Sequence, residues 1–114
     1  MGFSNSDGGD FHAGLWSGTA GSWVDLNPSG VSASFAYGTS GSQQVGFVDI
    51  DGGGGAYAAL WSGTAASYVN LNPSGSNFSD AYGISGGIEA GLAEFDGQQH
   101  AGIWSGTAAS WVDL

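Results

Sequence analysis

The 114-residue sequence contains no lysine and no arginine, against eight aspartates and two glutamates, and its formal net charge is −10. Basic side chains are what draw a protein to phosphate backbones and to anionic lipid headgroups. Their absence predicts that neither nucleic acid nor membrane is a partner of this chain. Bidentate arginine grips on carboxylates and phosphates are excluded for the same reason.

Cysteine is absent as well, which excludes disulfides, thiol nucleophiles and cysteine-based zinc sites. Long apolar runs are also missing, because no stretch approaches the ~20 residues of a membrane-spanning helix. The stability of so small a unit must then come from burial and assembly. Five tryptophans, six phenylalanines and four tyrosines supply much of the surface to be buried.

What the sequence does contain is a repeat. HAGLWSGTAGSWVDL (12–26) returns as YAALWSGTAASYVNL (57–71) and as HAGIWSGTAASWVDL (100–114). A second phrase, AYGTSGSQQVGFVDIDG (36–52), aligns without gaps on AYGISGGIEAGLAEFDG (81–97). A unit of about 44 residues is therefore present two and a half times, the pattern of a repeat architecture.

Each unit divides into four short strands, which we call A to D, and no segment has helical apolar spacing. The predicted ranges are A at 34–40 and 79–85, B at 44–50 and 89–95, C at 12–16, 57–61 and 100–104, and D at 22–26, 67–71 and 110–114. Asp-Gly, SGTA and NPSG mark the turns between them. With a degenerate B strand at the N-terminus, this predicts an all-β chain of eleven strands in one domain. Its parts are a partial unit B-C-D at 1–30 and two full units at 31–75 and 76–114.

Both faces of these strands carry apolar residues, which is typical of the four-stranded antiparallel blades of a β-propeller. Two and a half units are too few to close a propeller within one chain. We therefore expect identical chains to complete a ring, with a homodimer supplying about five or six blades and a homotrimer about eight or nine. A β-trefoil and a β-prism also contain three units of four strands and remain alternatives.

The order AYGISGG, QQVG, a turn, HAxLW and a closing VDL resembles the HAF repeat family of extracellular bacterial repeats. His12 and His100 match the family histidine, whereas Tyr57 departs from it. Glycine or alanine stands where the family has phenylalanine, at Gly14, Ala59 and Gly102. The resemblance implies a propeller-like array in a secreted or cell-surface protein, and it implies no catalytic residues.

Recurring aromatic residues are the best candidates for ligand binding. The outer D strands carry the pairs Trp23 and Asp25, Tyr68 and Asn70, and Trp111 and Asp113. Aromatic rings can stack on sugars while carboxylates and amides fix hydroxyl groups, and residues two apart share a strand face. A structural role for the rings is the simpler interpretation. The leading prediction is thus a self-assembling scaffold or interaction module, with a carbohydrate-binding lectin as the alternative.

The turns between strands B and C contain the acidic residues Asp7, Asp49, Asp51 and Asp96. Spaced oxygens around glycine resemble calcium-binding loops, but the third copy has lost ligands. Hairpin turns are the simpler interpretation, so we expect no cofactor and keep Ca²⁺ as the alternative. No G-x-S-x-G elbow is present, and we expect the protein not to be an enzyme. His12 and His100 are expected to make structural hydrogen bonds.

Overall fold

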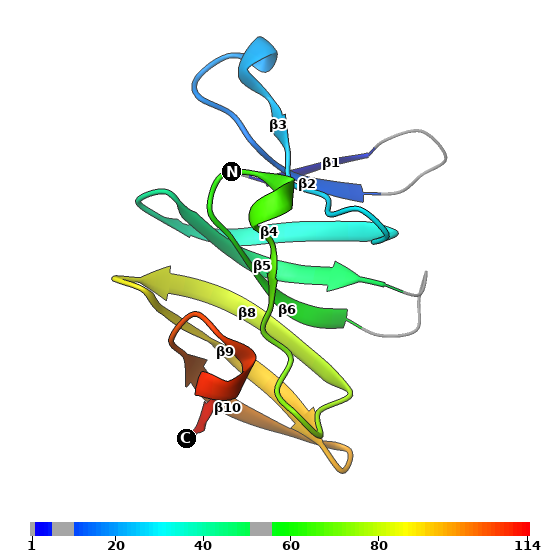
Figure 1. The fold of residues 1–114 in the computed structure, drawn as a ribbon, viewed down its shortest axis with the longest axis vertical. Coiled ribbons are helices and arrows are strands. Elements are labelled where there is room, and N and C mark those ends of the chain that lie inside the picture. The colour runs from blue at the N-terminus through cyan, green and yellow to red at the C-terminus, as the bar shows by residue number, and fades with distance from the viewer. Residues whose placement is uncertain (1, 6–10, 51–55) are drawn as a thin grey trace.

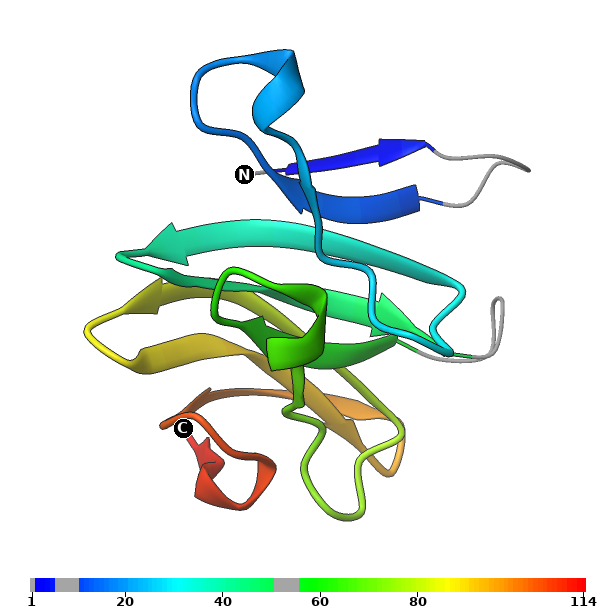
Figure 2. The same ribbon diagram turned by 45° about the horizontal axis from the view of Figure 1, so that its top comes forward.

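The computed structural model describes residues 2–5, 11–50 and 56–114. These residues form three antiparallel β-sheets and no α-helix. The sheets lie one beside the next along the longest dimension of the molecule (Figure 1), whose principal extents are 42 × 32 × 18 Å. Figure 2 shows the same stack after a 45° rotation, with the two chain ends in the outer sheets.

Within each sheet the strands follow chain order from one edge to the other. Sheet 1 contains β1 (Gly2–Asn5), β2 (Phe11–Leu15) and β3 (Val24–Asp25). Sheet 2 contains β4 (Ala33–Ser40), β5 (Gln43–Asp49), β6 (Ala56–Trp61) and β7 (Val69–Asn70). Sheet 3 contains β8 (Phe78–Ser85), β9 (Ile88–Phe95), β10 (Gln98–Trp104) and β11 (Val112–Asp113). The described residues thus confirm the all-β prediction, with eleven strands.

The D strands are shorter than predicted, because each is preceded by a 3-10 turn that takes up part of the SWVDL phrase. These turns are η2 (Ala20–Ser22), η3 (Ala65–Ser67) and η4 (Ala108–Ser110). Serine closes each turn: the Ser67 hydroxyl accepts from the Ser62 N–H at 2.7 Å and donates to the Thr64 carbonyl at 2.6 Å. Two short polar contacts therefore replace strand pairing at this point.

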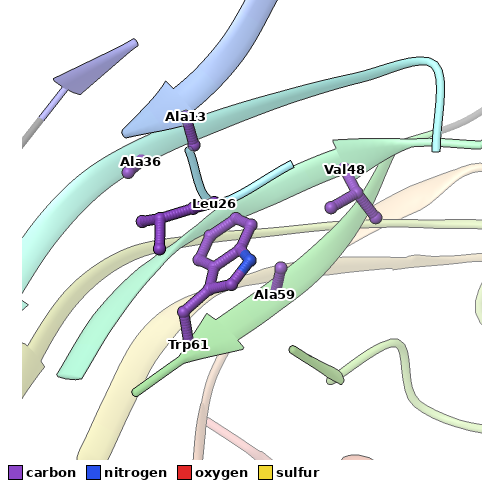
Figure 3. Close-up of a cluster of buried hydrophobic side chains, with 6 residues drawn as sticks. All are labelled: Ala13, Leu26, Ala36, Val48, Ala59 and Trp61. Carbon is purple, nitrogen blue, oxygen red and sulfur yellow. The ribbon is translucent and has the colours of Figure 1, made fainter. Parts of the chain in front are cut away.

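Two buried clusters hold the three sheets together. Sheet 1 contributes Ala13 and Leu26 to the first, which Figure 3 shows around the indole of Trp61 from sheet 2. In the second, Leu71 of sheet 2 packs with Trp104 of sheet 3. Each junction is therefore made by the same pair of surfaces: a leucine face, defined by Leu26, Leu71 and Leu114, meets a tryptophan face, defined by Trp16, Trp61 and Trp104.

A network of hydrogen bonds, which we call the polar seam, lies beside each apolar junction. The Ser34 hydroxyl accepts from the Ala13 N–H of sheet 1 at 3.0 Å and donates to Asn27 Oδ1 at 2.7 Å. Asn27 in turn donates to the Val31 carbonyl at 2.9 Å and so fixes the NPSG turn. The second seam repeats these contacts with Ala58, Ser79, Asn72 and Ser76. A satisfied buried network of this kind fixes how one sheet sits on the next.

The stack is open at both ends. The described residues form no closed barrel or ring, such as a β-trefoil, a β-prism or a complete propeller would show. Within the same residues, no helix is long and apolar enough to cross a membrane.

Candidate functional site

The outer aromatic residues pack against their own sheets. Each lies next to the C-strand tryptophan of its unit, with ring centroids 4.5 Å apart for Trp16 and Trp23 and 4.7 Å apart for Trp104 and Trp111. In sheet 2 the corresponding distance, from Trp61 to Tyr68, is 6.2 Å. The rings of this candidate ligand surface are half-buried, and their faces are partly occupied by the protein itself.

Glycines in the C strands make room for the indoles. A Cβ added at Gly14 would lie 1.8 Å from the ring of Trp23, and one at Gly102 would lie 2.1 Å from the ring of Trp111. The middle unit has Ala59 at this position and the smaller Tyr68 across from it. Units with glycine in the C strand therefore have tryptophan in the D segment, and the unit with alanine has the smaller tyrosine. This correlation in side-chain size is visible in the aligned repeats.

The polar side chains that accompany these aromatic residues also make hydrogen bonds within the protein. Asp25 accepts the Asn27 N–H with Oδ1 at 2.8 Å, and its Oδ2 lies 2.9 Å from His12 Nδ1. His100 Nδ1 and Asp113 Oδ2 are 2.5 Å apart. The prediction that both histidines make structural hydrogen bonds is confirmed. In the middle unit, Asn70 accepts the Asn72 N–H at 2.8 Å, which is the same turn contact that Asp25 makes with Asn27.

The six candidate ligand residues occupy equivalent places, one aromatic and one polar residue on each sheet. Asp25, Asn70 and Asp113 are exposed at the outer strands. The described part of the molecule has no pocket, so any ligand would meet an open surface there. The structure thus places one shallow polar and aromatic strip on each sheet.

Two of the four candidate metal ligands can be placed. Asp96 is exposed in the two-residue turn between β9 and β10, with φ of 52°, and Gly97 follows with φ of 79°. These left-handed values are those of the predicted Asp-Gly hairpin turn. Asp49 ends β5 in another sheet, and Asp7 and Asp51 lie outside the described residues. Among the described residues, no three metal-ligating side chains gather.

Two buried acids were missed by sequence reasoning. Asp80 is 7% exposed, and Glu89 is fully buried. One oxygen of each, Asp80 Oδ1 and Glu89 Oε2, has no hydrogen-bond partner in the described part of the chain. Glu89 Oε1 accepts the Gly106 N–H at 2.8 Å. The alignment of the repeats contained a sign of both buried acids. At these two positions the middle unit has the uncharged residues Phe35 and Gln44.

Burial sets the acidity of both carboxyl groups. Desolvation raises the pKa of Asp80 to about 6, against a smaller lowering by its hydrogen bond with Tyr82. Desolvation also raises the pKa of Glu89, opposed by its bond from the Gly106 N–H. A chain without lysine or arginine offers neither acid a fixed positive partner.

No family model matches the sequence, and neither the curated proteins nor the solved structures include a match.

Proposed function

We propose that this protein is a non-enzymatic β-propeller repeat module of the HAF type, which assembles with copies of itself into a closed ring and serves as a scaffold. The observation that carries the proposal is the repeated junction between sheets. Each junction joins a leucine face to a tryptophan face, and one copy of each face is open at an end of the stack.

The exposed fractions identify the two open faces. Leu114 is 79% exposed, whereas its equivalent Leu71 is fully buried under sheet 3. At the other end of the stack, Trp16 is 38% exposed, whereas Trp61 and Trp104 are fully buried. Because each open face is the missing half of a junction that the chain makes twice, a second copy offers the matching surface.

Such a contact is head-to-tail. Contacts of this kind close into a ring when the rotation between copies permits and form filaments when it does not. The described residues form one three-stranded and two four-stranded antiparallel sheets in succession. Because propeller blades are four-stranded antiparallel sheets, this succession supports the proposed closure as a homodimer or homotrimer. Both faces are apolar and every fixed charge is negative, so added salt should strengthen association by screening repulsion.

Light scattering coupled to size-exclusion chromatography tests the proposal. We expect a discrete dimer or trimer that persists on dilution to micromolar concentration. Trp16→Asp and Leu114→Asp, made on opposite faces, should each give smaller species. A monomer at about 100 μM wild-type protein, well above the Kd range of specific assemblies, would overturn the proposal.

Mixing the two variants tests the head-to-tail arrangement. The Trp16→Asp chain keeps an intact leucine face, and the Leu114→Asp chain keeps an intact tryptophan face. Their mixture should form a heterodimer through the one junction still available, while neither variant associates alone. Self-association of either variant would show that like faces pair, and would contradict the proposed ring.

Carbohydrate binding is the second candidate function. It is favoured by the recurrence of an aromatic residue with an exposed carboxylate or amide on every sheet. The partial covering of the rings by C-strand tryptophans counts against strong stacking. A glycan array followed by titration distinguishes the candidates: no sugar bound at millimolar concentration excludes the lectin and leaves the scaffold.

A further inference from the structure

Two tyrosines from neighbouring sheets lie against each other at the protein surface. Tyr37 belongs to β4 of sheet 2, and Tyr82 belongs to β8 of sheet 3. Their ring centroids are 5.7 Å apart, with an angle of 39° between the ring planes. Tyr37 is 43% exposed and Tyr82 is 52% exposed, so both rings are accessible to reagents in solution. Because Tyr37 is exposed in the sheet that is covered on both faces, this accessibility is not a property of an end of the stack.

The backbone brings this pair together. Each tyrosine is the extra residue of a β-bulge, at 36–38 in β4 and at 81–83 in β8. A bulge changes the direction of the side chain that it carries. The two strands also approach closely beside the bulges, since a Cβ added at Gly38 would lie 3.1 Å from the Tyr82 carbonyl oxygen. The Ala-Tyr-Gly phrase of two successive units therefore places its tyrosines side by side.

The hydroxyl group of Tyr82 has a proton acceptor beside it. It hydrogen-bonds to the carboxyl group of Asp80, which is 7% exposed, and the chain has no lysine or arginine to neutralise this acid. A phenol that loses an electron becomes a strong acid, so its proton leaves together with the electron. A carboxylate positioned at the phenolic O–H can take that proton. The Tyr82 ring is therefore prepared for one-electron oxidation at a point where it already contacts a second tyrosine.

We propose that Tyr37 and Tyr82 are an oxidative modification site, at which a peroxidase with hydrogen peroxide joins the two rings into a dityrosine crosslink. Each tyrosine loses one electron and its phenolic proton, which gives two phenoxyl radicals. The ring carbons next to the two C–O carbons form one C–C bond, and the hydrogen on each of these carbons then moves to oxygen and restores the two phenols. The two electrons and two protons reduce one hydrogen peroxide to two water molecules, so the chain loses two hydrogen atoms in all.

The crosslink would join sheet 2 covalently to sheet 3. A chain without cysteine cannot form disulfides, and Leu71 and Trp104 hold these two sheets together by noncovalent packing. Exposed side chains move within nanoseconds, so the short approach from 5.7 Å to bonded rings is within their reach. A link between residues 37 and 82 closes a long loop and restricts the unfolded chain, as a disulfide would. The crosslinked protein should therefore have a Tm about 10 °C higher than the unmodified protein.

The other two tyrosines provide an internal comparison. Tyr57 and Tyr68 are half-buried, and the Tyr68 hydroxyl is buried without a hydrogen-bond partner in the described part of the chain. Desolvation raises the pKa of Tyr68 to about 12, so this phenol holds its proton more tightly than an exposed one. A crosslink through Tyr68 is therefore not expected. The two pairs of tyrosines distinguish a specific reaction from general oxidation.

The test treats the full chain at micromolar concentration with a haem peroxidase and hydrogen peroxide. We expect a product that has the monomer mass less two hydrogen atoms and the blue fluorescence of dityrosine. Because the chain has no lysine or arginine, an endoprotease that cleaves before aspartate replaces trypsin. Mass spectrometry should then find fragment 25–48 joined to fragment 80–95. No product of this mass, crosslinks only between chains, or a link only through Tyr57 or Tyr68 would overturn the proposal.

Four single variants identify the rings that react. Tyr37→Phe and Tyr82→Phe keep the ring but should each abolish the crosslink, because a ring without a hydroxyl forms no phenoxyl radical. Tyr57→Phe and Tyr68→Phe are the matched controls and should leave its yield unchanged. A crosslink of the same mass that persists in Tyr37→Phe or Tyr82→Phe would contradict the assignment. An unchanged Tm after crosslinking would show that the bond does not restrain the native arrangement of the sheets, and would overturn the proposed link between them.

A further variant tests the proton acceptor. Asp80→Asn keeps the size of the buried side chain but cannot take a proton, and should slow crosslinking about tenfold or more. An equal rate would show that water takes the proton and would overturn the role assigned to Asp80. The reaction joins two rings of one chain, so it is independent of the proposed ring assembly, and failure of that assembly would leave these measurements unaffected.

Discussion

The middle sheet and the two outer sheets contain nearly the same sequence in different surroundings. Sheet 2 is covered on both faces, and its Trp61 and Leu71 are fully buried. Trp16 in sheet 1 and Leu114 in sheet 3 occupy equivalent positions and are exposed. These leucine and tryptophan side chains are therefore buried only where two units meet, and a single unit does not bury them by itself, as expected for repeat proteins.

Replacing equivalent tryptophans should give the largest difference. Trp61→Ala removes a fully buried indole and should lower the free energy of unfolding by about 3–5 kcal/mol, whereas Trp16→Ala should cost less than about half of that. Urea denaturation at low protein concentration measures both values. Equal losses would show that sheet 1 is covered in solution to the same extent as sheet 2. Trp61→Phe provides a milder variant if Trp61→Ala does not fold.

The buried acid of sheet 3 should give the next largest effect, seen in the pH dependence of stability. The folded-state pKa of Asp80 is raised from 3.8 to about 6, so the folded state holds a proton that the unfolded state has released between those values. Stability should then fall as pH rises from about 4 to 6, by up to about 3 kcal/mol from this group. The raised pKa of Glu89 acts in the same direction.

Uncharged variants separate the contributions of these two acids. Asp80→Asn should remove much of the slope between pH 4 and 6 and raise stability at pH 7, and Glu89→Gln imports the residue found at Gln44. Thermal unfolding from pH 3.5 to 8 provides the measurement. Asp96→Asn, at an exposed carboxylate in the turn between β9 and β10, serves as the control. An unchanged slope in Asp80→Asn would show that its carboxyl group is hydrated in the folded protein.

Much of the fold was predictable because its signals are local. Asp-Gly and NPSG mark turns through backbone preferences, so the strand positions follow from the sequence. The burial of Asp80 could not be predicted in this way, because it depends on how neighbouring sheets pack at a position where the previous unit has Phe35. Only part of the candidate ligand surface could be predicted. The recurrence of its residues is visible in the sequence, but the packing of Trp23 on Trp16 and of Trp111 on Trp104 depends on three-dimensional contacts.

The polar seam should give an intermediate effect. Ser79→Ala leaves the buried Ala58 N–H without its acceptor at 2.8 Å and should cost about 1–3 kcal/mol. Ser85→Ala, at an exposed position in the same strand, should change stability by less than about 0.5 kcal/mol. Chemical denaturation compares the two. Hydrogen exchange of the Ala58 amide should accelerate in Ser79→Ala alone, and equal exchange in both variants would show that the seam is not formed in solution.

The surface pairs of histidine and aspartate should give the smallest effect. His12 with Asp25 and His100 with Asp113 are side-chain contacts of the outer units, and both aspartates are about half exposed. Exposed pairs of this kind contribute at most about 1 kcal/mol. The middle unit already replaces the pair with Tyr57 and Asn70. The double variant His100→Tyr with Asp113→Asn should therefore unfold within about 0.5 kcal/mol of wild type, while Asp113→Asn alone should lose slightly more, because it leaves His100 without its carboxylate. A loss above about 2 kcal/mol in the double variant would contradict this prediction. It would show that the outer units need the His–Asp pair for their stability, whereas the middle unit is stabilised by being covered on both faces.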